Sequence, residues 1–376
     1  MKLKILFLFI LLSSLTGLSL SQTVDFNDLV KRNGLFYKKF TNKPFSGDVI
    51  GTKNGKLVNG IQEGNWTLYY DNGHLYSSTN FTNGKKYGLE EFFHRNGMIS
   101  KKVNFEENKK IGLEKIFNEN GQLLSEANFM KGKKEGLELI YESGLLKLRT
   151  NYKNGKKDGL EETFQNREQL FEKRFFRNGK KENEELVFYL SGQVKERRNY
   201  KNDLKEGLEE GFYESGELKY FFENSNDLPE GPSKEFHDNG IIYVKQFFKK
   251  GKLEGLKETF NKEGFLIKKS NFNSGKKQGK EEKFYQSGKI KLKRNFNVGN
   301  IIGFEEFFYE NGQLEGKIFW IDGKIEGEAR FHKNGLLKLT AKYKNGKKDG
   351  KLKYYDIKGG LEKTEIYSDD ICITGC

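Results

Sequence analysis

The stretch "NYKNGKKDGLEETF", from Asn151 to Phe164, returns almost unchanged as "KYKNGKKDGKLKYY" from Lys342 to Tyr355. Related phrases recur along the chain, and each contains a second glycine at a fixed position, which we call the register glycine. The register glycines are Gly64, Gly88, Gly112, Gly136, Gly159, Gly207, Gly231, Gly255, Gly279, Gly303, Gly327 and Gly350, and Asn183 occupies the one remaining place.

The spacing between register positions is 24 residues, or 23 in two places. Repetition at such a period predicts an array of stacked units instead of a single globular core. Thirteen units cover residues 60–367. Because each unit of an array packs only on its neighbours, the length of 376 residues does not indicate a number of globular domains.

Each unit carries two turn signals. One is the "NGKKxG" phrase, and the other is an Asn-Gly or Ser-Gly pair about nine residues after the register glycine, as at Asn96-Gly97. Asn-Gly supplies the positive φ angles that tight hairpin turns need, so the segments between the signals are predicted strands. The expected fold is all-β: an elongated array of about thirteen 23–24-residue antiparallel β-hairpin repeats.

Apolar side chains recur at three positions, represented by Phe93 in a first strand and by Ile99 and Phe105 in the following second strand. Ile99 and Phe105 are separated by an even number of residues, which predicts that both point to one face and form the core. The position before the first aromatic, Phe92 here, varies in character and predicts a solvated face. First strands carry acids and second strands bases, so we expect opposite charges across neighbouring strands.

Paired lysines recur in the turns and predict a basic ridge along one edge of the array. An anionic ligand or a membrane surface along this ridge is the functional interpretation, and solubility of an extended sheet is the structural one. The ridge residues are Lys85, Lys86, Lys133, Lys134, Lys156, Lys157, Lys180, Lys181, Lys276, Lys277, Lys347 and Lys348.

The N-terminal residues 1–21 have the pattern of a signal peptide. Lys2 and Lys4 precede an apolar run over 5–12, and small residues precede a predicted cut near Gln22. An uncleaved membrane anchor is the alternative, although the run is shorter than the roughly 20 residues that a spanning helix needs. Cleavage would lower the net charge from +14 to +12. Export predicts the periplasm, the outer surface or secretion, and argues against nucleic acid as a partner.

The chain also has distinctive ends. Residues 22–59 are predicted to form an N-terminal cap or degenerate repeat, and residues 368–376 form a tail that contains Cys372 and Cys376. In an oxidising compartment these two cysteines are candidates for a small disulfide ring. A metal site would need more ligands than two cysteines provide.

Nothing in the sequence nominates a catalytic, cofactor or metal site. The four histidines lie in different units, and adjacent glutamates on a strand point to opposite faces, so they do not converge on one substrate. No nucleophile is paired with a base in a constellation that occurs once. We therefore expect a protein that is not an enzyme and that needs no cofactor.

The "NGKKDGLEETF" phrase, "YENGQL" at Tyr309 to Leu314 and "NYKNGKKDG" at Asn151 to Gly159 resemble the MORN-repeat variant of bacterial proteins known as YwqK-family antitoxins. The resemblance implies antiparallel hairpins in an elongated sheet, and binding to proteins or lipids instead of catalysis. A Trp is common just after the register glycine in that family. Trp66 fits this habit, whereas other units replace it with Glu90, Glu114, Glu138 and Glu161.

The leading functional hypothesis is an exported, non-catalytic scaffold that binds another protein. Peripheral binding to anionic lipid or envelope polysaccharide through the lysine ridge is a second hypothesis. Neutralisation of a toxin protein is a third, which the resemblance alone suggests. The oligomeric state stays open.

Overall fold

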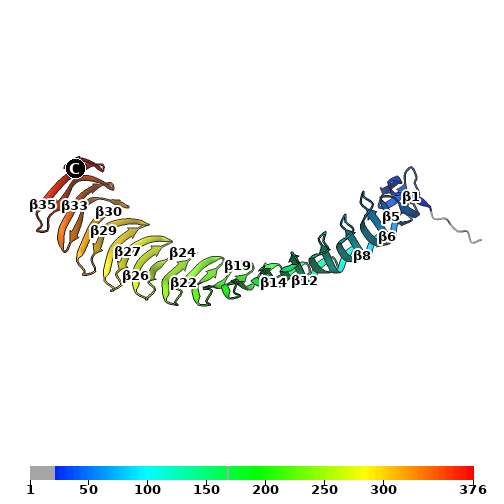
Figure 1. The fold of residues 1–376 in the computed structure, drawn as a ribbon, viewed down its shortest axis with the longest axis horizontal. Helices are drawn as coiled ribbons and strands as arrows, with labels where there is room; N and C mark the ends of the chain where they lie inside the picture. The colour runs from blue at the N-terminus through cyan, green and yellow to red at the C-terminus, as the bar shows by residue number, and fades with distance from the viewer. Residues whose placement is uncertain (1–21, 167–168) are drawn as a thin grey trace, which may run out of the picture. The chain divides into compact units, whose positions relative to one another are not determined.

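The computed structural model describes residues 22–166 and 169–376 and consists almost entirely of strands. The predicted signal peptide lies outside the described residues. The chain divides into two compact parts, one ending at Lys156 and the other spanning Lys157–Cys376, and Figure 1 shows each as a succession of hairpins. Within the described ranges no helix is long and apolar enough to cross a membrane.

The first part holds one short 3-10 helix, Phe26–Asp28, and thirteen strands. The strands are β1 (Thr23–Asp25), β2 (Leu29–Arg32), β3 (Leu35–Lys38), β4 (Gly47–Ile50), β5 (Lys53–Val58), β6 (Ile61–Tyr69), β7 (Leu75–Thr82), β8 (Lys85–Phe93), β9 (Ile99–Glu106), β10 (Lys109–Phe117), β11 (Leu123–Met130), β12 (Lys133–Glu142) and β13 (Leu145–Lys153).

The second part, beginning with the strand at its boundary, continues in the same way. Its strands are β14 (Lys156–Gln165), β15 (Gln169–Arg177), β16 (Lys180–Lys181), β17 (Asn183–Phe188), β18 (Val194–Lys201), β19 (Leu204–Lys205), β20 (Gly207–Phe212), β21 (Leu218–Ser225), β22 (Leu228–Phe236), β23 (Ile242–Lys249), β24 (Lys252–Leu253), β25 (Gly255–Phe260), β26 (Leu266–Asn273), β27 (Lys276–Phe284), β28 (Ile290–Asn297), β29 (Asn300–Phe308), β30 (Leu314–Ile321), β31 (Lys324–Ile325), β32 (Gly327–Lys333), β33 (Leu336–Lys344), β34 (Lys347–Tyr355), β35 (Leu361–Ser368) and β36 (Ile371–Thr374).

From β4 onward, the two strands of each hairpin and the neighbouring strands of successive hairpins pair antiparallel within each part. For example, β8 pairs with β7 on one side and with β9 on the other. The short strands β16, β19, β24 and β31 pair with the same preceding strand as the strand that follows them. This arrangement confirms the predicted all-β array of hairpins. Opposite charges also lie across neighbouring strands as expected, with Glu91 and Lys102 separated by 3.1 Å.

Residues 22–59 close the first part with a small apolar core. Strand β1 pairs in parallel with β4, while β2 and β3 form a separate hairpin. The buried core consists of Val24, Phe45, Val49, Leu57 and Trp66. Trp66 belongs to the first repeat, and its indole nitrogen donates to the Lys56 carbonyl at 3.2 Å, so the cap and the repeat share one core.

The two repeat lengths correspond to two kinds of turn. In most units the second turn has a three-residue loop in which only the glycine has a positive φ, as at Gly121 with φ 78°. In the two shorter units the loop has two residues, and both Ser143 and Gly144 have positive φ angles, as do Asn334 and Gly335. The 23-residue steps therefore mark hairpins with a tighter turn.

The register glycine creates a bulge in each regular first strand. In β8, Lys86 pairs with Phe81 and Glu90 pairs with Thr79, so three residues of β8 oppose the single residue Asn80. Gly88 lies inside this bulge with φ 79°, a conformation that favours glycine. The bulge brings the side chains of Lys86 and Glu90 together on one face.

A second irregularity overturns the predicted core. Phe92 pairs with Lys101, but Phe93 pairs with Ile99, so one residue of β9 is left over. Ile99 pairs with Phe93 and lies on its face of the sheet. Phe105 pairs with Gly88 and shares its face. Gly88 and Phe93 are five residues apart, an odd number, so they lie on opposite faces. The prediction that Ile99 and Phe105 point the same way was wrong because alternation does not continue through a bulge.

The face predicted to be solvated is also more buried than expected. The varying position is half-buried or buried in every unit named here: Leu68, Phe92, Ile116, Thr163, Gly211, Glu235, Lys283 and Phe307. It lies an even two residues from the most buried position of the first strand, and so shares its face. Each hairpin thus has a packed face, which carries this column and Phe105, and an opposite face, which carries Phe93.

Candidate binding surfaces

The turn edge is built by hydrogen bonds between successive units. In nine units the side chain before the register position accepts a hydrogen bond from the backbone N–H of the next turn, at 2.6–3.0 Å. The pairs include Glu63 with Asn83 and Glu206 with Asn226. These bonds hold the turns in line, so the turn lysines lie on a common edge within each part.

The predicted basic ridge separates into two groups. The first lysine of each pair is exposed on the turn edge: Lys85, Lys133, Lys156, Lys180, Lys276 and Lys347. The second lysine is half-buried, and its ammonium lies over an aromatic ring of the same hairpin: Lys86, Lys134, Lys157, Lys181, Lys277 and Lys348. Only the first group faces outward.

The second lysines meet a column of glutamates on the packed face, which we call the acidic column. Its members stand two residues after the register position: Glu90, Glu114, Glu138, Glu161, Glu185, Glu209, Glu281 and Glu305. All are buried except the half-buried Glu114. In every unit but that of Glu305, the carboxylate forms an ion pair with the lysine four residues earlier.

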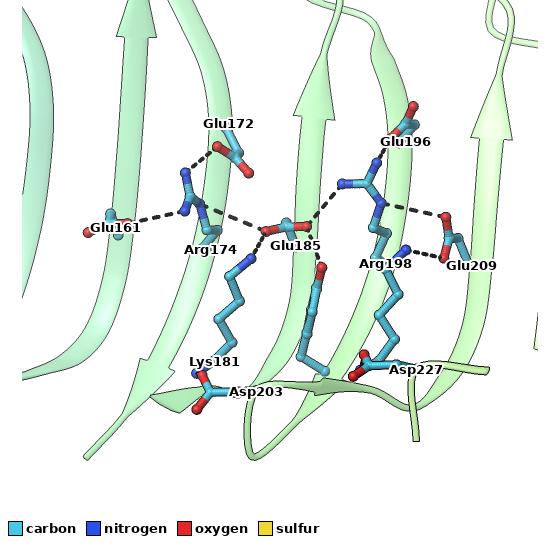
Figure 2. Close-up of polar contacts among 12 residues, drawn as sticks. Glu161, Glu172, Arg174, Lys181, Glu185, Glu196, Arg198, Asp203, Glu209 and Asp227 are labelled. Atoms are coloured by element: carbon cyan, nitrogen blue, oxygen red, sulfur yellow. Dashed lines mark hydrogen bonds and ion pairs between the residues drawn. The ribbon is translucent and has the colours of Figure 1, made fainter. Parts of the chain in front are cut away.

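In the second part, arginines join neighbouring members of the acidic column. Figure 2 shows Glu185 between Arg174 and Arg198, with Glu161 and Glu209 beyond them. The ion-pair distances from Glu185 are 3.8 Å to Arg174 and 3.1 Å to Arg198. Arg174 also pairs with Glu172, and Arg198 with Glu196.

The charges of this network balance. Its cations are Lys157, Arg174, Lys181, Arg198 and Lys205, and its carboxylates are Glu161, Glu172, Glu185, Glu196 and Glu209. Five positive groups therefore meet five negative groups. These charged groups are satisfied by one another, and they pack side by side on the packed face.

The protonation of the acidic column follows from its partners. Burial opposes ionisation of Glu281, but hydrogen bonds from Lys277, Ser270 and Arg294 outweigh it and lower the pKa to about 2. Burial likewise opposes ionisation of Glu185, but a hydrogen bond and the positive charge of Lys181 outweigh it, so the pKa of Glu185 is lowered. Glu281 and Glu185 are therefore ionised at neutral pH.

The opposite face presents an apolar row in the first part. Leu89, Leu113 and Leu137 each follow a register glycine, and 39–40% of each residue is exposed. The charged groups two positions further along are paired within the sheet, Glu91 with Lys102 and Lys115 with Glu126 at 3.1 and 3.3 Å. The leucines are therefore the exposed apolar side chains of this face, beside charges that are already paired.

The N-terminal cap contains a polar cleft of about 750 Å³. Lys38, Lys43 and Lys56 line it together with Thr41 and Ser46, and no acidic residue lines it. This cleft occurs once in the described residues, unlike the lysines of the turn edge. Sequence reasoning missed it because its lysines are spread over residues 38–56 without a motif.

Two of the four histidines, His94 and His237, take structural positions. The Nε2 atoms of His94 and His237 lie 3.0 Å from the carbonyl oxygens of Phe117 and Phe260 in the next unit. Tyrosines occupy the same position in other units and donate to the equivalent carbonyl, as Tyr70 does to Phe93. Residues 22–166 and 169–376 contain no group of three or more metal-ligating side chains.

Cys372 and Cys376 are joined by a disulfide in the structure, with their Cα atoms 6.3 Å apart. Strand β36 carries Cys372 and pairs with β35, so the ring closes the last strand of the second part. The disulfide encloses only the tail.

The pairing within the acidic column is a second feature that sequence reasoning missed. Its glutamates were recognised, but only as partners of bases on neighbouring strands. The available signal was the recurring spacing of a lysine four residues before a glutamate, with the register glycine between them, as in Lys181 and Glu185. That spacing predicts an ion pair only once the bulge is known, because residues four apart in a regular strand are too far apart to pair.

Comparison with protein families finds the MORN repeat variant in seven segments: residues 62–83, 86–107, 110–131, 181–202, 229–250, 277–297 and 305–322. These segments coincide with the units of the array. MORN repeats suggest a repeat-based binding scaffold. Comparison with curated proteins finds no match, so the antitoxin assignment stays a prediction.

Among solved structures, the crystal structure of TcdB2-TccC3 is similar at 11% sequence identity and a TM-score of 0.16, covering 89% of this chain and 22% of that one. The structure of the Photorhabdus luminescens Tc holotoxin pore with the mutation TccC3-D651A has 11% identity, a TM-score of 0.15 and the same coverage. This chain thus spans about a fifth of the chains it matches. Likenesses this remote do not bear on function.

Proposed function

We propose that this protein is an exported, non-catalytic scaffold whose open sheet binds another protein. The MORN repeats support a binding scaffold, and the exposed leucine row of the first part is the observation that favours a protein partner. Apolar side chains on a regular surface are suited to burial against another polypeptide. The paired charges beside them leave the leucines as the main source of binding energy.

The lysine ridge is a weaker candidate for the main interaction. One exposed lysine per unit, with two strands of about 4.8 Å each between them, gives a spacing of roughly 10 Å. This spacing exceeds the Debye length of about 8 Å at physiological ionic strength, so neighbouring lysines reinforce one another little. The second lysines are held by rings and carboxylates, which reduces the ridge further.

An anionic ligand is the second candidate, and the cleft of the N-terminal cap favours it over the ridge. Lys38, Lys43 and Lys56 converge there without an acidic lining residue. A carboxylate or phosphate group of an envelope polysaccharide or lipid has the chemistry to pair with them. A toxin protein would be one form of protein partner, and only the family resemblance suggests it.

The experiment is a pull-down from envelope extract with the mature chain, with retained proteins identified by mass spectrometry at low and high salt. Three variants are compared with the wild type: L89S/L113S/L137S, K85Q/K133Q/K180Q and K38Q/K43Q/K56Q. We expect one defined protein that survives high salt and that only the leucine variant loses.

Two results would contradict this proposal. Capture of lipid or polysaccharide that disappears in K38Q/K43Q/K56Q would make the cap cleft the functional site. Retention of the same protein by the leucine variant at high salt would show that the partner uses another surface. Circular dichroism of each variant checks that its strands are intact.

A further inference from the structure

Six units contain an internal ammonium site on the packed face, where a lysine lies between an aromatic ring and a carboxylate. The ammonium of Lys181 lies 4.5 Å from the centre of the Tyr200 ring and 2.8 Å from the Glu185 carboxylate. Lys277 has the same environment, 4.6 Å from the Phe296 ring and 2.5 Å from Glu281. The repeat therefore defines a binding geometry for an ammonium: an aromatic face on one side and a carboxylate on the other.

The hairpin of β22 and β23 keeps the ring but lacks the cation. Phe248 pairs with the register glycine Gly231, as an aromatic residue does in most other units, for example Phe296 with Gly279. Pro229 stands where the lysine belongs, and Ser233 stands in the acidic column. Here the packed face contains a cavity of about 280 Å³ lined by Phe248, Pro229 and Ser233 among others.

The preceding hairpin supplies a second aromatic wall. Tyr220 pairs with Gly211, and a Cβ atom on Gly211 would lie 2.1 Å from the Tyr220 ring. The tyrosine ring therefore occupies the space that a side chain at 211 would fill. It stacks on Phe222 with 5.8 Å between ring centres, and both rings line the cavity.

A carboxylate also faces this cavity, from a different position. Glu235 lines the cavity and accepts a hydrogen bond from the Gln246 amide at 3.2 Å. No cation lines the cavity, and no ion pair is formed by Glu235 within the described residues. Arg198 acts electrostatically on Tyr220, but it is already paired with Glu185 and Glu209.

We propose that this cavity binds an ammonium group on an aliphatic stem, namely a lysine side chain of the partner protein. The stem would lie among Tyr220, Phe222 and Phe248, and the ammonium would meet Glu235 in place of the missing internal pair. This inference rests on the proposed function, because it names the chemistry of the side chain that the partner inserts.

The chemistry follows from the protein's own repeats. Six second lysines of the predicted ridge lie over the equivalent ring at 4.5–5.0 Å. Pro229, Ser233 and Glu235 line one cavity together with Tyr220, whose ring occupies the space that Gly211 leaves in the preceding hairpin. The hairpin of β22 and β23 lacks the internal lysine. It keeps the aromatic ring, and Glu235 supplies a carboxylate.

The test is a titration of the full mature chain with Nα-acetyllysine N-methylamide, followed by ligand-observed NMR. The matched probe is Nα-acetylnorleucine N-methylamide, which has a similar stem and no charge. We expect the lysine probe to bind about tenfold more tightly than the norleucine probe, as one desolvated cation–aromatic contact with a carboxylate would give.

The decisive variant is P229K/S233E, which restores the internal lysine and glutamate of the other units. Its own lysine should fill the cavity, so binding of the lysine probe should fall at least about tenfold. E235Q should also weaken the lysine probe without changing the norleucine probe. E258Q is the control, because Glu258 pairs with Lys269 at 3.5 Å on the opposite face and should leave both probes unaffected.

Equal binding of the two probes, or undiminished binding by P229K/S233E, would overturn the lysine site. If the double variant does not fold, undiminished binding of the lysine probe by E235Q would overturn the site in the same way. The pull-down separates this inference from the proposed function. A partner retained equally by P229K/S233E would leave the scaffold standing without a lysine pocket, whereas loss of the partner in both this variant and the leucine variant supports the two together.

Discussion

The ammonium of Lys277 lies 2.5 Å from a carboxylate oxygen of Glu281, four residues further along the same first strand. In a regular strand, residues four apart are separated by about 13 Å. The two side chains meet because Lys277 and Glu281 pair with Phe272 and Ser270, which are only two residues apart. The bulge around Gly279, which has φ 77°, shortens the distance between Lys277 and Glu281 along the strand.

The register glycine itself can be tested at this position. Gly279→Ala should destabilise the fold by about 1–2 kcal/mol, because a left-handed conformation is costly for alanine while the space around Gly279 is open. Gly279→Asn is the matched variant and should cost less, since Asn183 holds the equivalent position with φ 61°. Urea unfolding measures both. Equal costs would mean that φ is not the constraint.

Removal of a buried carboxylate should be costly. Glu281→Ala leaves Lys277 and Arg294 without their partner on the packed face, and we expect a loss of about 3 kcal/mol in unfolding free energy. Glu282→Ala changes the same charge on the opposite face and should cost less than about 1 kcal/mol. Similar losses in the two variants would contradict the structural role of the acidic column.

Acid should weaken the fold through the same carboxylate. Burial opposes its ionisation, but three hydrogen-bond donors hold the pKa of Glu281 at about 2, below its ordinary value of 4.5. The stabilisation is therefore complete above about pH 4.5 and is lost as the pH falls toward 2. The urea midpoint measured from pH 6 to pH 2 should fall less in Glu281→Gln than in the wild type.

The bonds between successive turns should be visible in hydrogen exchange. Glu206 accepts from the backbone N–H of Asn226 at 2.9 Å. In Glu206→Ala the Asn226 amide should exchange about tenfold faster, because the bond that protects it is lost. Glu214→Ala, on an exposed second turn, is the control and should leave that amide unchanged. Unaltered exchange in both variants would mean that Glu206 does not hold the turn.

The space beneath Tyr220 can be probed by a double-mutant cycle. Gly211→Ala places a Cβ within 2.1 Å of the Tyr220 ring, and we expect a loss of about 1–3 kcal/mol through overpacking. In Gly211→Ala/Tyr220→Ala the clash disappears, so the two costs should not add. Thermal unfolding of the four proteins measures the coupling. Simple additivity would show that the ring does not depend on this glycine.

Much of the array was predictable from local signals. The period of the register glycines predicted the units, and Asn-Gly pairs predicted the turns. Acidic residues in first strands and basic residues in second strands predicted ion pairs across neighbouring strands, such as that of Glu91 with Lys102. Each of these features depends on residues close in sequence or on directly neighbouring strands, where backbone geometry leaves few alternatives.

The sequence by itself determined the repeat, its turns and its antiparallel strands, because those follow from φ preferences and periodicity. Only the tertiary structure decided which face is packed. Bulges at the register glycine and beside Phe93 shift the alternation of side chains between the two faces. As a result Glu90 is buried, and Lys86, which was expected on the ridge, forms an ion pair with Glu90. The cavity likewise required structure, since Tyr220 in β21, Glu235 in β22 and Phe248 in β23 come from three strands and meet only when the hairpins stack.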